Sequence, residues 1–218
     1  MPAALTALVA VGAGGLGMLV GVLLSRLVAR FPDRERGRSV RPPWIEAWTA
    51  ALFVLVALRF GAAWELPAYL WFAGAAVLLA VIDLQHKLLP DRITLPSIGI
   101  GAALLAAVAV ATGDGAPLVR ALLGALVLYV VFVVLVLISP RSIGMGDAKL
   151  AALLGLYLGW LGWDVLLLGA AAGFVVQAVL ALVLLATRRI GLRGELPFGP
   201  AMLIGAAVAI GWSDSLLG

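Results

Sequence analysis

Long apolar stretches, separated by short polar segments, run along the whole chain. A membrane-spanning helix needs roughly 20 mostly apolar residues, and the stretches approach that length. Helices are expected at about Ala3–Val28, Trp44–Phe60, Pro67–Leu88, Ile93–Ala111, Leu118–Ile138, Ala148–Leu161, Trp163–Thr187 and Phe198–Leu217. The stretches are rich in leucine, alanine and valine and lack the two-residue alternation of a membrane barrel. The pattern predicts an all-α polytopic membrane protein with about eight transmembrane helices.

The composition supports this class. Hydrophobic residues make up 64% of the 218 residues and charged residues only 12%, against roughly 45–50% and 25% in soluble domains. A soluble protein of this composition lacks the polar surface to cover itself. A disordered chain is excluded too, because that class combines low hydrophobicity with high charge. We expect a single membrane-embedded domain over residues 1–218.

Basic residues gather in alternate loops of this arrangement. The positive-inside rule places such loops in the cytoplasm, so both termini are expected on the extracytoplasmic side. The net charge of +4 is then explained by topology, and no nucleic-acid partner is expected. The basic residues on this side are Arg26 at the end of the first helix, Arg30, Arg34, Arg36, Arg38 and Arg41 in the first loop, Lys87 and Arg92, Arg141 and Lys149, and Arg188, Arg189 and Arg193. Only Arg59 and Arg120 lie near the opposite loops.

The chain has no cysteine and a single histidine, His86. Disulfides, thiolate metal sites and cysteine nucleophiles are therefore absent. One histidine cannot build a histidine-rich metal site either. No metal and no cofactor are expected.

Two aspartates need a functional explanation, because ionisable groups at membrane depth are costly and usually functional. Asp83 follows an unbroken apolar run near the cytoplasmic end of the third helix, and Asp147 directly precedes the sixth helix at the same boundary. Each also has a structural interpretation. Asp147 is a suitable helix N-cap, and Asp83 could snorkel to the interface or pair with Lys87 one turn later.

Two carboxyl groups at one depth can perform acid–base chemistry together. Like charges a few ångströms apart cannot both ionise cheaply, so the pair shares one proton. The ionised member can then activate water while the protonated member polarises a carbonyl group. Asp147 begins a helix, where the dipole favours its charged form, so it is expected to be the base and Asp83 the acid. Glycines before Asp147 would let an extended substrate approach the backbone.

Two other functions compete with hydrolysis. A proton-coupled transporter could use the carboxylates as a relay, but such sites lie near the midplane, at broken helices, whereas both aspartates are expected near one surface. A structural subunit of a membrane assembly, with no chemistry of its own, would need neither aspartate.

The motifs around both aspartates resemble those of the type IV prepilin peptidases, membrane aspartic proteases of the GxGD type. The segment 144–150, GMGDAKL, matches the family's G-x-G-D-x-K-L motif. Three further segments resemble family motifs, namely Ile82–Leu84 with Leu88–Asp91, Leu196–Pro200, and Pro43–Glu46 with Thr49 and Ala50. The resemblance implies that Asp83 and Asp147 are catalytic. It also implies a substrate, the leader peptide of type IV prepilins or type II secretion pseudopilins, cleaved at the cytoplasmic face of the bacterial inner membrane.

The chain departs from the family in its first loop. Longer members carry a zinc-binding insertion with four cysteines there, whereas this chain has a short basic loop over residues 29–43. Only Gly21 and Leu24 agree with the family's G-S-F-L-N segment in Gly21–Ser25. Bifunctional members use this region to methylate the processed pilin with S-adenosylmethionine. N-methyltransferase activity is therefore not expected here.

Three further expectations concern local structure. Asp91, after Pro90, should cap the next helix. Lys149 should either stabilise the charged form of Asp147 or contact lipid phosphates. Glycines of the first and sixth helices, namely Gly12, Gly14, Gly15, Gly17, Gly21, Gly155, Gly159 and Gly162, should mediate close helix packing.

Overall fold

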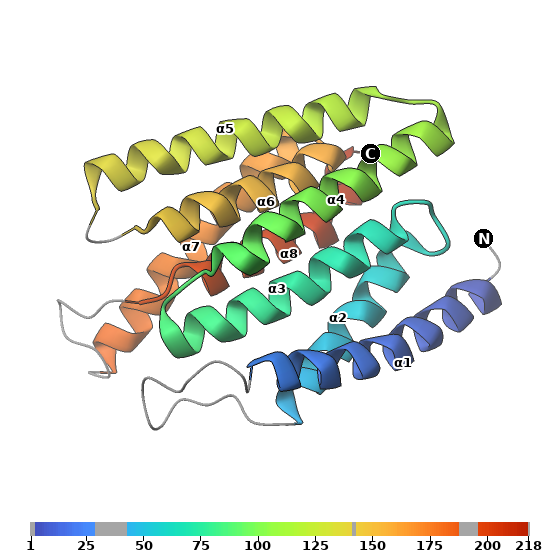
Figure 1. Ribbon diagram of the computed structural model, residues 1–218, viewed down its shortest axis with the longest axis horizontal. Coiled ribbons are helices and arrows are strands. Elements are labelled where there is room, and N and C mark those ends of the chain that lie inside the picture. Colours follow the sequence, from blue (N-terminus) through green and yellow to red (C-terminus); the bar gives the residue numbers. More distant parts are fainter. Residues whose placement is uncertain (1–2, 29–42, 141–142, 188–195, 218) are drawn as a thin grey trace. The chain divides into compact units, whose positions relative to one another are not determined.

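The computed structural model describes residues 3–28, 43–140, 143–187 and 196–217. These ranges contain eight helices and no strand (Figure 1). The helices are α1 (Ala3–Val28), α2 (Trp44–Phe60), α3 (Leu66–His86), α4 (Asp91–Thr112), α5 (Ala116–Ile138), α6 (Met145–Leu161), α7 (Trp163–Ala186) and α8 (Gly199–Leu217). The prediction of an all-α protein is confirmed, and every predicted helix end lies within three residues of the observed one.

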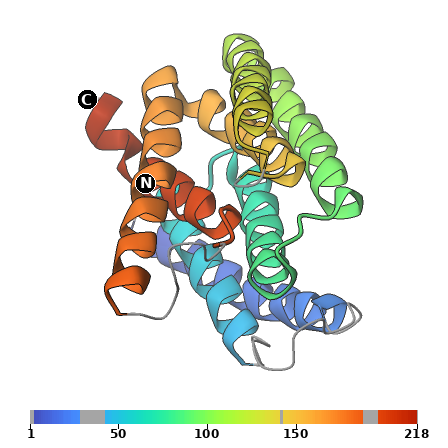
Figure 2. The same cartoon turned by 90° about the vertical axis from the view of Figure 1, so that its left-hand side faces the viewer.

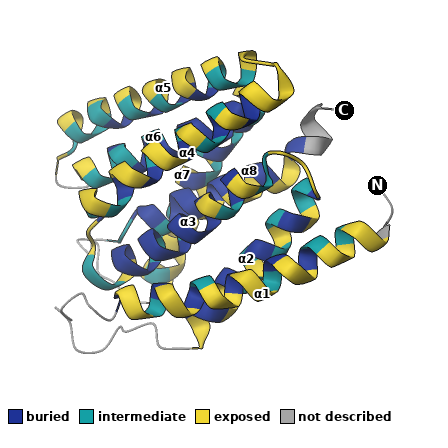
Figure 3. Cartoon of the chain, turned by 45° about the vertical axis from the view of Figure 1, so that its right-hand side comes forward, coloured by how far each residue is buried: buried dark blue, intermediate teal, exposed yellow. Residues whose placement is uncertain are grey.

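Five helices are long and apolar enough to cross a membrane, namely Ala4–Val28 of α1, α3, α4, α5 and α7. The other three are shorter: α2 and α6 have 17 residues each, and the apolar part of α8 is Gly199–Ser213. Many large apolar side chains are exposed, including those of Val130, Val134 and Leu137 on α5. Exposed positions recur along the length of α5 (Figure 3). Such surfaces suit a polytopic membrane protein. That all eight helices cross the membrane, and that both termini lie on the extracytoplasmic side, stay predictions.

The chain forms two compact units. The first comprises residues 1–88 and 92–114, which carry α1 to α3 and nearly all of α4. The second comprises residues 115–218, with α5 to α8, together with the short segment Leu89–Asp91. The expected single peptidase domain stays a prediction.

In the first unit, α1 packs closely on α2 through small residues. A Cβ atom on Gly17 would lie 2.7 Å from the Cα of Ala50, and one on Gly21 would lie 2.6 Å from the Cα of Glu46. Side chains at these positions would force the helices apart. Beside this contact lies an apolar cluster that includes α3, formed by Leu24, Val28, Ile45, Val77, Leu78, Val81 and Ile82.

The second unit contains two closely packed helix pairs, α5 with α6 and α7 with α8 (Figures 1 and 2). A Cβ atom on Gly124 of α5 would lie 2.6 Å from the carbonyl oxygen of Gly155 on α6. A Cβ atom on Gly205 of α8 would meet the backbone of Gly173 on α7 even more closely. Arg120 adds polar contacts to the first pair: its Nε donates to the carbonyl oxygen of Gly159 at 2.7 Å, and Nη2 donates to that of Trp160.

The glycine prediction is only partly correct. Gly14, Gly17, Gly21, Gly155 and Gly159 face a neighbouring helix as expected. A Cβ atom on Gly12 or Gly15 would meet nothing within 4 Å, so these two do not mediate packing in the described residues. Gly162 lies between α6 and α7 and ends α6.

Several predicted basic positions lie outside the described residues. They are Arg30, Arg34, Arg36, Arg38 and Arg41, with all but Pro43 of the loop at 29–43, and Arg141, Arg188, Arg189 and Arg193.

Candidate active site

Asp83 lies in the last turn of α3 and is buried, with 5% of its surface exposed. Its backbone carbonyl accepts a hydrogen bond from the N–H of Lys87 at 2.8 Å. Lys87 adopts a left-handed conformation, with φ 50° and ψ 41°, and ends the helix. Val81 and Ile82 belong to the apolar cluster of the first unit. The prediction that Asp83 lies near the end of the third helix is confirmed.

Asp147 lies in the first turn of α6, in the second unit. Its Oδ2 accepts a hydrogen bond from the N–H of Gly144 at 2.9 Å, and its own N–H donates to the carbonyl oxygen of Gly144 at 3.0 Å. The expected N-cap role is therefore wrong in position: Gly144 is the N-cap, and the helix begins three residues earlier than predicted. Asp147 still ties down the helix start, because its carboxylate accepts one of the first free amide hydrogens.

The electrostatic surroundings of Asp147, which precedes the apolar segment of α6, differ from the expectation. Burial raises the pKa of this carboxyl above its ordinary value and is the larger effect, while the hydrogen bond from Gly144 lowers it. The helix dipole favours the charged form of this carboxyl. Loss of solvent on burial disfavours the charged form and is the larger effect.

The glycine before Asp147 is required by packing inside the protein. A Cβ atom on Gly146 would lie 2.9 Å from the Cβ of Leu89, which is itself buried. Gly144 differs, because it is exposed and a Cβ atom there would meet no atom closer than the Asp147 Oδ2 at 3.7 Å. Gly144 is exposed, whereas the Cβ position of Gly146 faces Leu89, and the approach of a substrate strand to these glycines stays a prediction.

Lys149 forms an ion pair that was not expected from the sequence, and a contact with lipid phosphates stays a prediction. Its Nζ donates to Oδ1 of Asp91 at 2.6 Å, within the second unit. Asp91 is the first residue of α4 and lies 58 residues from Lys149 in sequence. This ion pair was missed because each partner had a sufficient local explanation.

The remaining family-like motifs support helix ends. Phe198, directly before α8, stacks on Phe132 of α5 with ring centroids 5.9 Å apart and lies 5.2 Å from the ring of Phe174 of α7. Its carbonyl oxygen accepts the N–H of Met202 at 3.1 Å. The motif thus fixes where α8 begins.

Glu46, in the first turn of α2, is 8% exposed. Its Oε2 is buried and has no hydrogen-bond partner among the described residues. A carboxylate in such surroundings is costly.

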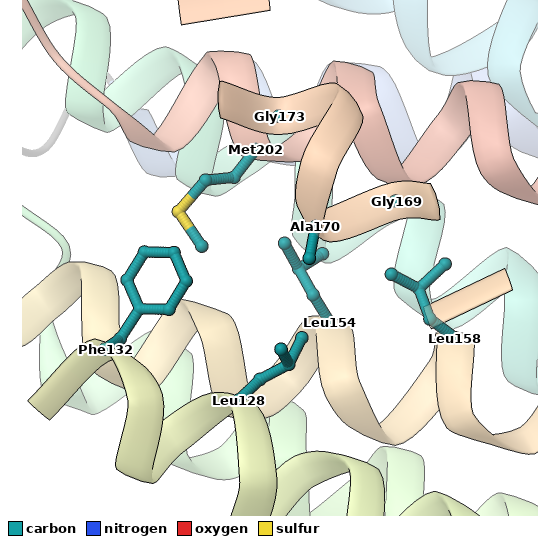
Figure 4. Close-up of a pocket in the computed structure, with 8 residues that line it drawn as sticks. All are labelled: Leu128, Phe132, Leu154, Leu158, Gly169, Ala170, Gly173 and Met202. Atoms are coloured by element: carbon teal, nitrogen blue, oxygen red, sulfur yellow. The ribbon is translucent and has the colours of Figure 1, made fainter. Parts of the chain in front are cut away.

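The described residues include no group of three or more His, Asp or Glu side chains placed to hold a metal ion. A small cavity of about 10 Å³ lies within the second unit, lined by Leu128, Phe132, Leu154, Leu158, Gly169, Ala170, Gly173 and Met202 (Figure 4). The lining is apolar and contains neither aspartate, so the cavity has no part in acid–base chemistry.

Known proteins with similar sequences carry peptidase names. Relatives from Pseudomonas putida and Pseudomonas aeruginosa, both called prepilin leader peptidase/N-methyltransferase, are 34% identical over 82% and 81% of this chain. A protein of the same name from Xanthomonas campestris is 32% identical over 89% of the chain. The chain spans about three fifths of the length of the first two relatives, 61% and 60%, and 68% of the third. No solved structure matches it.

The profile of the type IV leader peptidase family matches residues 70–187. This range is more than half of the chain and includes both Asp83 and Asp147. The chain therefore belongs to the type IV leader peptidase family.

Proposed function

We propose that this chain is an aspartic endopeptidase that removes the leader peptide from type IV prepilins or type II secretion pseudopilins. Asp83 and Asp147 are the catalytic residues, and cleavage occurs at the cytoplasmic face of the bacterial inner membrane. The observation that carries the proposal is that the family match spans both aspartate motifs. The burial of Asp83 and the fixed start of α6 at Asp147 support it.

The mechanism requires both carboxyl groups to approach within a few ångströms of each other and share one proton. The ionised carboxylate takes a proton from water as the water oxygen attacks the scissile carbonyl carbon. The protonated carboxyl donates to the carbonyl oxygen, which becomes a hydroxyl group of the tetrahedral intermediate. When the C–N bond breaks, the carboxyl that took the proton from water donates it to the leaving nitrogen, and the other carboxylate takes back the hydroxyl proton of the intermediate, so the pair again holds one proton. Which aspartate starts ionised is left to experiment, because burial of Asp147 opposes the dipole argument.

Leader cleavage is the only activity proposed. The relatives named above also carry the name N-methyltransferase. This chain has no cysteine and a short first loop, so we propose that it does not methylate the processed pilin. Radiolabel from S-adenosylmethionine on the pilin N-terminus, with purified components, would contradict this.

Co-expression with a prepilin tests the proposal directly. The wild type should yield leader-free pilin, identified by its mass, and Asp83→Asn and Asp147→Asn should each abolish processing. Asp164→Asn, at the start of α7, is the matched control and should process normally. All variants must be present in the membrane at equal amounts. Processing by either catalytic-site variant at the wild-type rate would refute the assignment.

A further inference from the structure

The ion pair between Asp91 and Lys149 joins α6 to the start of α4, and Lys149 is two residues after the proposed catalytic Asp147 in sequence. Nζ of Lys149 lies 2.6 Å from Oδ1 of Asp91, and 57% of the Asp91 side chain and 24% of the Lys149 side chain are exposed. Exposed pairs of this kind contribute only about 0–1 kcal/mol to stability. The pair is therefore poorly explained as a stabilising element of the fold.

A second contact joins the same two pieces of chain. Gly146 of α6 packs against Leu89, two residues before Asp91. Gly146 and Lys149 are three residues apart and so lie on one face of the helix. That face is turned toward Leu89–Asp91, and in sequence Asp147 lies between the two contacting residues, Gly146 and Lys149. The contacts therefore fix both the position and the rotation of the helical turn that carries the Asp147 carboxyl.

We propose that Asp91 and Lys149 are positioning residues for peptide cleavage, an inference that rests on the proposed function. Their ion pair holds the first turn of α6 against Leu89–Asp91 and so orients the Asp147 carboxyl toward the scissile bond. Neither residue contacts the reacting atoms. Small misplacements of a reacting group strongly reduce the rate of the chemical step, so a pair of little value to stability can matter to catalysis.

Separate measurement of kcat and KM distinguishes a positioning role of Asp91 and Lys149 from a purely structural one. In purified enzyme acting on a prepilin, Asp91→Asn and Lys149→Met should each lower kcat about tenfold while KM stays within about twofold. Thermal denaturation in detergent should change little, because the Asp91 side chain is exposed and solvent screens the pair. Asp114→Asn, beyond the other end of α4, is the control and should keep wild-type kcat.

A double-mutant cycle tests whether the two residues act as one pair. Asp91→Asn combined with Lys149→Met should reduce kcat no further than the worse single variant. Asp91→Glu and Lys149→Arg, which keep the charges, should recover much of the activity. Additive losses, unchanged kcat in both single variants, or a loss confined to KM would each overturn the inference.

The same variants also distinguish a failure of the positioning role from a failure of the proposed peptidase function. If the wild type fails to cleave any prepilin, both fail. If the wild type cleaves, Asp83→Asn and Asp147→Asn are inactive, and the ion-pair variants turn over normally, only the positioning role is refuted.

Discussion

Replacing Gly146 with alanine tests how closely the start of α6 must be held. The added Cβ would lie 2.9 Å from the Cβ of Leu89 and 3.6 Å from its backbone nitrogen. The Cβ of Leu89 is bonded to the main chain, so no rotation of the side chain can relieve the contact. Either α6 or the Leu89–Asp91 segment has to move.

The size of the movement follows from van der Waals distances. Carbon atoms pack best at about 3.5–4.0 Å, so the two segments must separate by about 0.6–1.1 Å. Asp147 is the next residue and moves with the helix. Because a misplacement of about 1 Å can cost roughly 100-fold in rate, we expect kcat to fall about 10- to 100-fold, or about 1.4–2.7 kcal/mol in activation free energy.

Initial rates of prepilin cleavage by purified enzyme in detergent measure this effect. Gly99→Ala in α4 is the control, because a Cβ atom there would meet nothing within 4 Å. Gly144→Ala provides a second comparison: the fold should tolerate it, and a loss of kcat/KM with normal thermal stability would indicate substrate contact at that residue. Wild-type turnover by Gly146→Ala would refute the reasoning that the Leu89 contact sets the position of Asp147.

Three further predictions concern stability and topology. Burial raises the pKa of Asp147, so the folded state binds this proton more tightly than the unfolded chain, and wild-type stability should fall as pH rises above the ordinary carboxyl pKa. The Tm of Asp147→Asn minus that of the wild type, from tryptophan fluorescence, should therefore be higher at pH about 7 than at pH about 4. An equal Tm difference at both pH values would contradict this prediction. Arg120→Met removes two charge-assisted hydrogen bonds to the end of α6 and should lower Tm by about 4–8 °C, or about 2 kcal/mol, whereas an unchanged Tm would mean that they add nothing. Because the chain lacks cysteine, single variants Leu88→Cys and Asp114→Cys report sidedness to an impermeant thiol reagent: only the second should react in intact spheroplasts, and the reverse pattern would invert the proposed topology.

The helices were predictable because their signal is local. Each is a long apolar run bounded by charged residues, glycine or proline, and these features can be read directly in the sequence. The largest error was the start of α6. The residues Gly144–Asp147 contain two glycines, which favour a loop, yet the helix begins at Met145 because the Asp147 carboxylate and the Gly144 backbone satisfy each other.

The candidate site was only partly predictable, because its supporting contacts join distant positions. The motifs identified both aspartates without reference to three-dimensional structure. The pairing of Asp91 with Lys149 spans 58 residues and has no local signature. The packing contact between Gly146 and Leu89 could not be predicted for the same reason, because it too joins positions far apart in sequence. The degree of burial of Asp147, which sets the direction of its pKa shift, also depends on tertiary packing.

The placement of Leu89–Asp91 limits how this polypeptide can be divided. The segment belongs to the unit of α5 to α8, yet it includes the first residue of α4, and the chain on both sides of it belongs to the first unit. A gene split at the α4–α5 connection would give the second fragment all four of its helices but leave the partner of Lys149 and the neighbour of Gly146 on the first. The start of α6 would then be completed only when the two fragments associate, so neither fragment alone carries a finished second unit.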